Sequence, residues 1–370
     1  MKKMLSLAAM LAVLSYASPA SAELKITGDA AVRERIQYDN STTAKDLKTQ
    51  YRIRLKTSAD LGSGYFFKSM MQNEGVAGGW QTVAATNTER NPIEVSNFYF
   101  GRNLEDSHYM LGRIPLNSVN NPIYDLTLYP VPTSFTSAGV YAVDIPVATW
   151  NFDRVFGLNY GTKVGCGDLN ATIVVLDNNS TIENTPATGD GLFNDGYLLN
   201  LSYKTNIGDV TVEPQALITL TDAQGNTYQK ISPNTAGANI SIPAGKSKIG
   251  LSGFYTICRD TKGMKGTVAT NVDYDGYLLR VKGESGPVTA WVDYNRTRDR
   301  SNPIGSSAPE TTYSNAFLWA QYNIKVHESA TGTFSLTPTV RYRASGREVT
   351  ALYSDRINQL RGELYATVTF

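Results

Sequence analysis

The chain has 370 residues, with 34 Lys and Arg against 33 Asp and Glu, and hydrophobic residues make up 41% of it. This near-neutral balance gives no sign of a nucleic-acid or anionic-lipid partner, and we expect no nucleic-acid partner. After residue 22, no apolar run approaches the roughly 18–20 residues that a membrane-spanning helix needs. Low overall hydropathy suits a soluble protein, but it also suits a membrane-spanning sheet in which only every second residue faces lipid.

The first 22 residues have the layout of a secretory signal peptide. Two lysines follow the initiator Met, residues 5–14 are almost wholly apolar, and small residues fill positions 18–22. We expect cleavage after Ala22, which leaves one domain at 23–370 with 348 residues, of which 32 are basic and 33 acidic. An exported chain can form disulfides, but we expect Cys166 and Cys258 to lie at different heights and to stay unpaired.

Strict alternation of apolar and polar residues dominates residues 23–370. It is clearest, in chain order, at 51–61, 210–221, 333–343 and 363–370. In the last of these segments Leu364, Ala366 and Val368 are separated by polar residues. A period of two predicts strands with one apolar and one polar face, and no long segment has the pattern of an amphipathic helix.

The breaks between these strands are of two kinds, which alternate along the chain. Short turns are predicted near 62–64, 105–106, 165–167, 206–208, 244–246, 284–286 and 329–331. Long loops are predicted at 39–49, 74–93, 115–147, 178–195, 222–235, 260–272, 298–311 and 345–357. Seven turns and eight loops join sixteen strands, as in an all-β, closed antiparallel transmembrane barrel with short periplasmic turns and long extracellular loops. The strand near 236–243 is required by this parity as much as by its own pattern.

A secreted β-sandwich would also be built from many alternating strands. Two observations favour the barrel. Many strands span roughly 11–14 residues, which is longer than the ~5–6 typical of globular sheets. Aromatic residues also fall into two groups on the apolar face, as membrane-interface belts require. We expect Tyr38, Tyr51, Tyr294 and Tyr342 near the long loops, and Tyr65, Tyr160, Tyr203, Tyr277 and Phe370 near the short turns or the periplasmic end.

The polar face carries a concentration of basic residues at the two ends of the chain. A sixteen-stranded barrel encloses a water-filled lumen, and its first and last strands are neighbours. One basic wall is therefore predicted from Arg33, Arg35, Arg52, Arg54, Lys56, Arg341, Arg343 and Arg361. Asp125 and Asp144 in the loop at 115–147 would face it, and such charges select ions by sign. The alternative is that these charges are solvated lumen side chains with no role in selection.

The last strand, Leu364-Tyr-Ala-Thr-Val-Thr-Phe370, resembles the C-terminal signal that outer-membrane barrels present to the barrel assembly machinery. With the export signal, this resemblance implies the outer membrane of a Gram-negative bacterium, with outer-membrane lipid around the barrel.

The chain as a whole resembles the Gram-negative general porins. The most specific part is Phe98-Tyr-Phe-Gly-Arg102, a short turn and Met110-Leu-Gly-Arg113, which precede the longest loop. The resemblance implies that this third loop, 115–147, folds into the lumen and narrows it. It further implies a homotrimer that passes small polar solutes and ions by passive diffusion.

No residues are grouped in a way that predicts catalysis. The two histidines, His108 and His327, are far apart, and neither a zinc motif nor a nucleophile elbow is present. We therefore expect no enzyme activity, no cofactor and no metal. Two alternatives to passive diffusion stay open: a substrate-selective channel of the same fold, and a plugged barrel that acts as a surface adhesin or structural protein.

Overall fold

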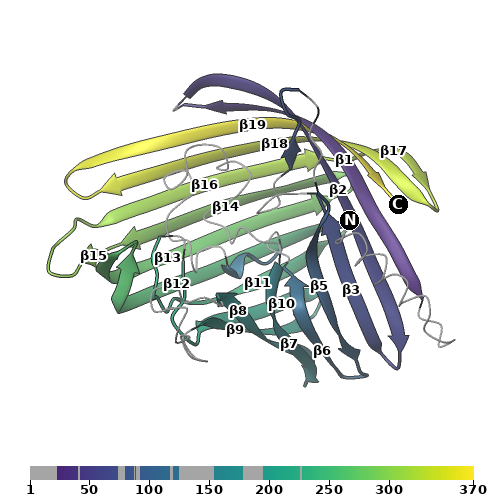
Figure 1. The fold of residues 1–370 in the computed structure, drawn as a ribbon, viewed down its shortest axis with the longest axis horizontal. Helices are drawn as coiled ribbons and strands as arrows, with labels where there is room; N and C mark the ends of the chain where they lie inside the picture. The colour runs from purple at the N-terminus through teal and green to yellow at the C-terminus, as the bar shows by residue number, and fades with distance from the viewer. Residues whose placement is uncertain are drawn as a thin grey trace.

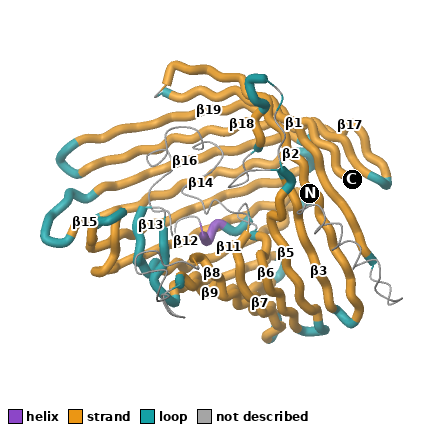
Figure 2. The backbone as a smooth tube through the Cα atoms, in the orientation of Figure 1, coloured by secondary structure: helices purple, strands orange, loops and turns teal. Residues whose placement is uncertain are grey.

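The computed structural model describes residues 23–40, 42–73, 80–86, 88, 92–116, 120–124, 154–177, 195–225 and 227–370. The predicted signal peptide at 1–22, and the loop carboxylates Asp125 and Asp144, lie outside these residues. Among those described, the sole helix is the 3-10 turn η1 (Pro122–Tyr124), and no helix is long and apolar enough to cross a membrane. The rest of the regular structure is strand (Figure 2).

The strands form one sheet that closes on itself (Figure 1). Neighbours in sequence pair antiparallel, and β1 pairs with both β2 and β19. Their bounds are β1 (Leu24–Asp39), β2 (Thr42–Gly62), β3 (Tyr65–Gln72), β4 (Gln81–Thr82), β5 (Glu94–Asn103), β6 (Ser107–Pro115), β7 (Arg154–Val164), β8 (Gly167–Asp177), β9 (Gly196–Ile207), β10 (Val210–Thr219), β11 (Asn234–Ala244), β12 (Ser247–Lys265), β13 (Val268–Ser285), β14 (Val288–Asp299), β15 (Asn302–Pro303), β16 (Thr311–Tyr322), β17 (Ile324–Ser329), β18 (Gly332–Val349) and β19 (Tyr353–Thr369).

Three of these elements are additions to a neighbouring strand. The two-residue strands β4 and β15 pair with β2 and β13 beyond the ends of β3 and β14. β16 and β17 are two parts of one strand, because both pair with β18 and Asn323 alone separates them. Within the described ranges, sixteen strands therefore form the barrel wall, and the predicted sixteen-stranded antiparallel barrel is confirmed. The weakest predicted strand, at 236–243, is present as β11.

Alternation sets the two faces of every long strand. On β14, Asp293 and Asn295 are fully buried on the inner face, whereas Val292 and Tyr294 between them are 47% and 40% exposed on the outer face. Since the side-chain period of a strand is two, the outer residues form an apolar surface for lipid and the inner ones a polar lining.

All seven predicted short turns are present, but three predicted long loops are wrong. β1 ends at Asp39 and β2 begins at Thr42, so only two residues separate them. β12 and β13 meet at a turn after Lys265, and three residues separate β18 from β19. The predicted loops at 39–49, 260–272 and 345–357 are therefore extensions of the strands. The alternation fades there because the strands have left the bilayer, while the hydrogen bonds between backbones continue without an apolar face.

The predicted aromatic belts include one misplaced residue. Tyr277 was expected near the short turns, but its ring lies 6.1 Å from that of Tyr294, toward the long-loop end. Tyr203 lies as predicted beside a short turn, where its hydroxyl donates to the Val164 carbonyl at 2.9 Å. Both cysteines are free, Cys166 exposed in a turn and Cys258 buried, as expected.

Candidate functional site

The inner face of β18, β19 and β1 carries three arginines around one buried carboxylate. Glu363 lies 3.2 Å from Arg33 Nη1, 2.9 Å from Arg341 Nε and 3.8 Å from Arg361 Nη1. The hydroxyl of Tyr365 also donates to Glu363 at 2.7 Å. One acid thus holds three cations together where the first and last strands meet.

A second acid serves the arginines of β2. Asp29 on β1 accepts from Arg54 Nε at 2.9 Å and lies 3.6 Å from Arg52 Nη2. Arg52 and Arg54 follow the period of two and face Asp29 across the β1–β2 ladder. The predicted acids Asp125 and Asp144 would face the arginines from the long loop, whereas the structure places two other acids, Asp29 and Glu363, in the wall itself.

An aromatic side chain from the second long loop covers this wall. The guanidinium carbons of Arg33 and Arg52 each lie 4.6 Å from the ring centroid of Trp80. The Trp80 ring also meets Tyr365 edge to face, with centroids 5.3 Å apart. Trp80 immediately precedes β4, whose pairing with Gln50 and Tyr51 of β2 brings the loop back onto the barrel. Sequence reasoning did not find Trp80, because nothing in a loop pattern indicates which way the chain turns.

The remaining predicted basic residues take different positions on the same inner surface. Arg343 is fully buried and donates to Asn315 Oδ1 at 2.7 Å. Arg361 also donates to Gln37 Oε1, at 3.1 Å, and Arg35 is buried. Lys56 is exposed toward the end of β2 that leads into a short turn. The structure thus gathers five of the arginines around Asp29 and Glu363, while Lys56 lies further along β2 on the same inner surface.

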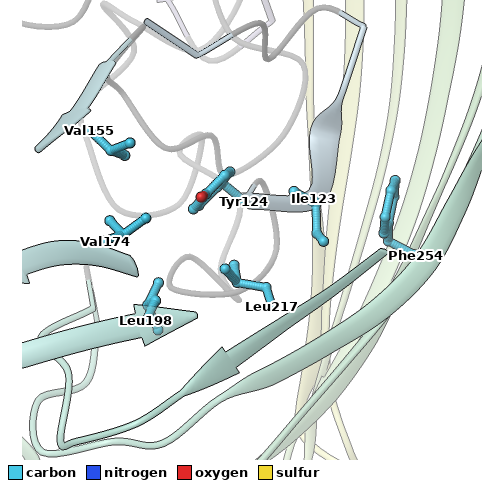
Figure 3. Packing of buried hydrophobic residues seen from close by; sticks show 7 residues of the cluster. All are labelled: Ile123, Tyr124, Val155, Val174, Leu198, Leu217 and Phe254. Carbon is cyan, nitrogen blue, oxygen red and sulfur yellow. The ribbon is translucent and has the colours of Figure 1, made fainter. Parts of the chain in front are cut away.

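The described part of the third loop rests on the opposite wall. Residues 120–124 form a foot in which Ile123 and Tyr124 pack against Val174 (β8), Leu198 (β9) and Leu217 (β10), as Figure 3 shows. These inward wall residues are apolar, against the polar pattern of the rest of the lining, because the foot covers them. Polar contacts flank the cluster: Asn121 donates to Gln215 at 3.0 Å, and Asn200 donates to the Tyr124 hydroxyl at 3.3 Å.

Beside this foot lies a cavity of about 400 Å³. Its lining mixes charges from β9 to β13, with Lys204, Lys248 and Lys282 near Glu213 and Glu284. Lys282 donates to Asn120 of the foot at 2.6 Å and pairs with Glu284 at 2.6 Å. The lining carries charges of both signs, which suits polar solutes more than a single tightly held ligand.

The arrangement therefore has an arginine wall on one side and a loop foot with a charged cavity on the other. In the part of the chain that the structure describes, no three His, Cys, Asp or Glu side chains are placed to hold a metal ion. The predicted opposing acids Asp125 and Asp144 fall outside that part, so their role stays a prediction.

Comparison with known proteins identifies the family. Residues 6–333 match the family model described as Gram-negative porin. Comparison with curated protein sequences gives no match.

Solved structures with the same fold cover nearly the whole chain. An anion-selective porin from Comamonas acidovorans is 12% identical, with a TM-score of 0.54, and the alignment covers 94% of this chain and 100% of that one. The outer-membrane channel DcaP of Acinetobacter baumannii is 12% identical, with a TM-score of 0.54 and coverage of 95% and 99%. OmpT of Vibrio cholerae, in a trimer form, is 10% identical, with a TM-score of 0.52 and coverage of 94% and 99%. At these identities the likeness shows the fold, and the family match supplies the rest: the chain belongs to the Gram-negative porins and is a diffusion channel of the outer membrane.

Proposed function

We propose that small polar solutes and ions cross this barrel passively, between the arginine wall and the loop foot, and that the wall gives the channel a preference for anions. The barrel has no catalytic role in this proposal. A trimer is part of the proposal too, supported by the trimer form of the similar Vibrio cholerae OmpT. A crosslinking ladder that ends at three subunits would support the trimer, and a purely monomeric species in mild detergent would exclude it.

The observation that carries the anion preference is the imbalance of charge on one inner surface. Eight basic side chains from β1, β2, β18 and β19 share that surface with Asp29 and Glu363. These two acids are shared among five cations, Arg33, Arg52, Arg54, Arg341 and Arg361. A cluster that keeps a positive excess attracts anions and raises their local concentration.

The test uses two variants of opposite sign in planar bilayers at low salt. Replacing Arg52, Arg54 and Lys56 together by glutamine removes three positive charges and should move the reversal potential toward cations. Asp29→Asn removes the paired acid on the same strands and should move it toward anions. Both shifts should fade at about 1 M salt, where the Debye length is roughly 3 Å. Unchanged reversal potentials in both variants would mean that the wall does not border the ion path.

A substrate-selective channel is the second candidate, favoured by one group of inner aromatic residues. The rings of Trp291 and Trp319 lie 4.1 Å apart, and Arg280 lies 5.9 Å from the Trp291 ring. Such surfaces bind planar solutes by stacking. Liposome swelling separates the candidates when the rate is measured with sugars of increasing size, each over a range of concentrations. A rate that rises linearly with concentration supports passive diffusion, saturation supports selectivity, and tight liposomes support a plugged barrel.

A further inference from the structure

A ladder of charged side chains covers the outer surface of β12, β13 and β14, just beyond the apolar zone. The cross-strand register arranges this surface in rows. Going away from the short turns, the rows are Leu251–Val281–Val292, Gly253–Leu279–Tyr294, Tyr255–Tyr277–Arg296, Ile257–Asp275–Arg298 and Arg259–Asp273–Arg300, the last completed by the bond from the Arg300 amide to the Asp273 carbonyl. The surface changes from aliphatic to aromatic to charged within five rows.

These charges face away from the lumen. The residues that alternate with them on β14, Asn295 and Thr297, are buried on the inner face. The side chains of Arg298 and Arg259 are 50% and 71% exposed. The ladder lies at the end of the barrel that carries β15 and the long loops, away from the C-terminus (Figure 1).

Two aspartates hold some of these arginines in place but are too few to cancel the positive charge of the group. Asp275 lies 3.1 Å from Arg298 Nη2 and 2.7 Å from Arg300 Nη1, and Asp273 lies 2.7 Å from Arg300 Nη2. The contact of Arg259 with Asp273 is longer, at 3.9 Å. Arg296 lies in the row of Tyr277, one row closer to the apolar zone than Asp275. Four arginines against two aspartates leave this patch with a positive excess.

Height in the membrane indicates the partner. Tyrosine rings prefer the boundary between hydrocarbon and headgroups, so side chains one or two rows further out lie among the headgroups. Because the long loops of a porin are extracellular, this is the outer leaflet. The anionic groups available at that level are phosphates on lipid headgroups, and the guanidinium fork binds phosphate oxygens two at a time.

We propose that the patch formed by Arg259, Arg296, Arg298 and Arg300 binds phosphate groups of phosphorylated outer-leaflet lipid. Arg296 contacts the headgroup from the aromatic boundary, while Asp273 and Asp275 hold Arg298 and Arg300 in position above it. The patch therefore fixes one flank of the barrel to the lipid around it. This site is on the outside of the wall and does not depend on the solute path through the lumen.

The experiment measures lipid binding by the folded, detergent-solubilised full-length barrel using native mass spectrometry. The probes are bisphosphorylated lipid A, the same lipid with its phosphates removed, and inorganic phosphate as a competitor. The test variant is R296Q/R298Q. The matched control is R356Q, which changes an exposed outward arginine on β19 in the same register row as Arg296 but without arginines in the next row.

Wild type and R356Q should bind the phosphorylated lipid about tenfold more tightly than the dephosphorylated lipid, and R296Q/R298Q should lose that difference. Circular dichroism and heat-modifiable migration should be equal in all three, since the changes are on the surface. The proposal is overturned if R296Q/R298Q retains the preference, if R356Q loses it equally, or if millimolar inorganic phosphate displaces the lipid completely, because free phosphate would then be the ligand.

Discussion

Trp80 shows how one residue can set the effective charge of a surface. Its ring lies against two guanidiniums, and each such contact is worth about 0.5–2 kcal/mol depending on its exposure to water. The ring also excludes water from one side of Arg33 and Arg52. Both arginines are therefore partly withdrawn from solutes in the lumen.

Trp80→Ala should strengthen the preference for anions. The freed guanidiniums can approach a passing anion, and a unit charge at 4 Å in water contributes about 1 kcal/mol. The anion-to-cation permeability ratio at low salt should rise by about two- to fivefold, as measured by the reversal potential. Trp80→Phe keeps a ring and should give a smaller rise. A shift toward cations in the Ala variant would contradict this role.

Cys166 offers a probe of the periplasmic end. It lies in the turn between β7 and β8, where hydrogen bonds from Thr205 and then Tyr203 lower the pKa of its thiol. A lowered pKa means more thiolate, and hence faster alkylation, at a given pH. Thr205→Val should raise that pKa, so the labelling rate of the folded barrel with a maleimide should fall at neutral pH and recover at higher pH. Equal pH profiles would show that Thr205 does not act on the thiol.

At the scale of elements, sequence patterns predicted what the bilayer dictates. Alternation along strands such as β14 follows from having lipid on one side, and all seven short turns interrupt it visibly. Outside the bilayer that constraint disappears, so the hairpins that continue β12 and β13 were mistaken for loops. Likewise the eight basic residues could be assigned to the inner face by parity, whereas their pairing with Asp29 and Glu363 depends on cross-strand register, which alternation alone does not specify.

Family resemblance predicted that the third loop folds into the lumen, but the residues of the loop foot did not by themselves indicate where it packs. Ile123 and Tyr124 are ordinary loop residues until Val174, Leu198 and Leu217 are seen to be inward-facing and apolar. Three strands that each carry an apolar residue on the polar face are a signal that could have been read, had the register been known.

Ile123→Ala should loosen the foot. Truncating a fully buried aliphatic side chain costs roughly 2–5 kcal/mol, whereas Ile123→Val should cost about 0.5–1.5 kcal/mol. We expect larger and noisier single-channel currents for the Ala variant and nearly normal ones for the Val variant. Identical recordings for Ala and wild type would show that the foot does not control the width of the conducting path.

At the scale of the molecule, closure depends on the contact between β1 and the end of β19. The amide of Gly28 donates to the Phe370 carbonyl at 2.7 Å and that of Phe370 to the Gly28 carbonyl at 3.1 Å. The Phe370 ring also occupies the space above Gly28, so that a Cβ there would lie 2.7 Å from a ring carbon. Glycine at position 28 therefore leaves room for the Phe370 ring to cover the seam, the junction between β1 and β19.

Deleting Phe370 should lower the heat-modifiable, folded fraction in the outer membrane. Two net hydrogen bonds of about 1 kcal/mol each are lost together with the ring contact. Phe370→Ala keeps the backbone bonds and isolates the ring, and Phe370→Tyr should assemble normally. A normal yield after deletion would count against an assembly role for this residue.

The seam also pairs the two strands that are furthest apart in the sequence. The hydrogen bond from Arg33 to Tyr365 joins residues 332 positions apart in the chain, while most other strand pairs are hairpins. Long-range pairing is slow because the chain entropy is lost before the contact is gained. Until it forms, β1 and β19 each present an open edge that another chain can add to. The waiting time before closure, more than the final stability, should therefore set how much of this protein is lost to aggregation on its way to the membrane.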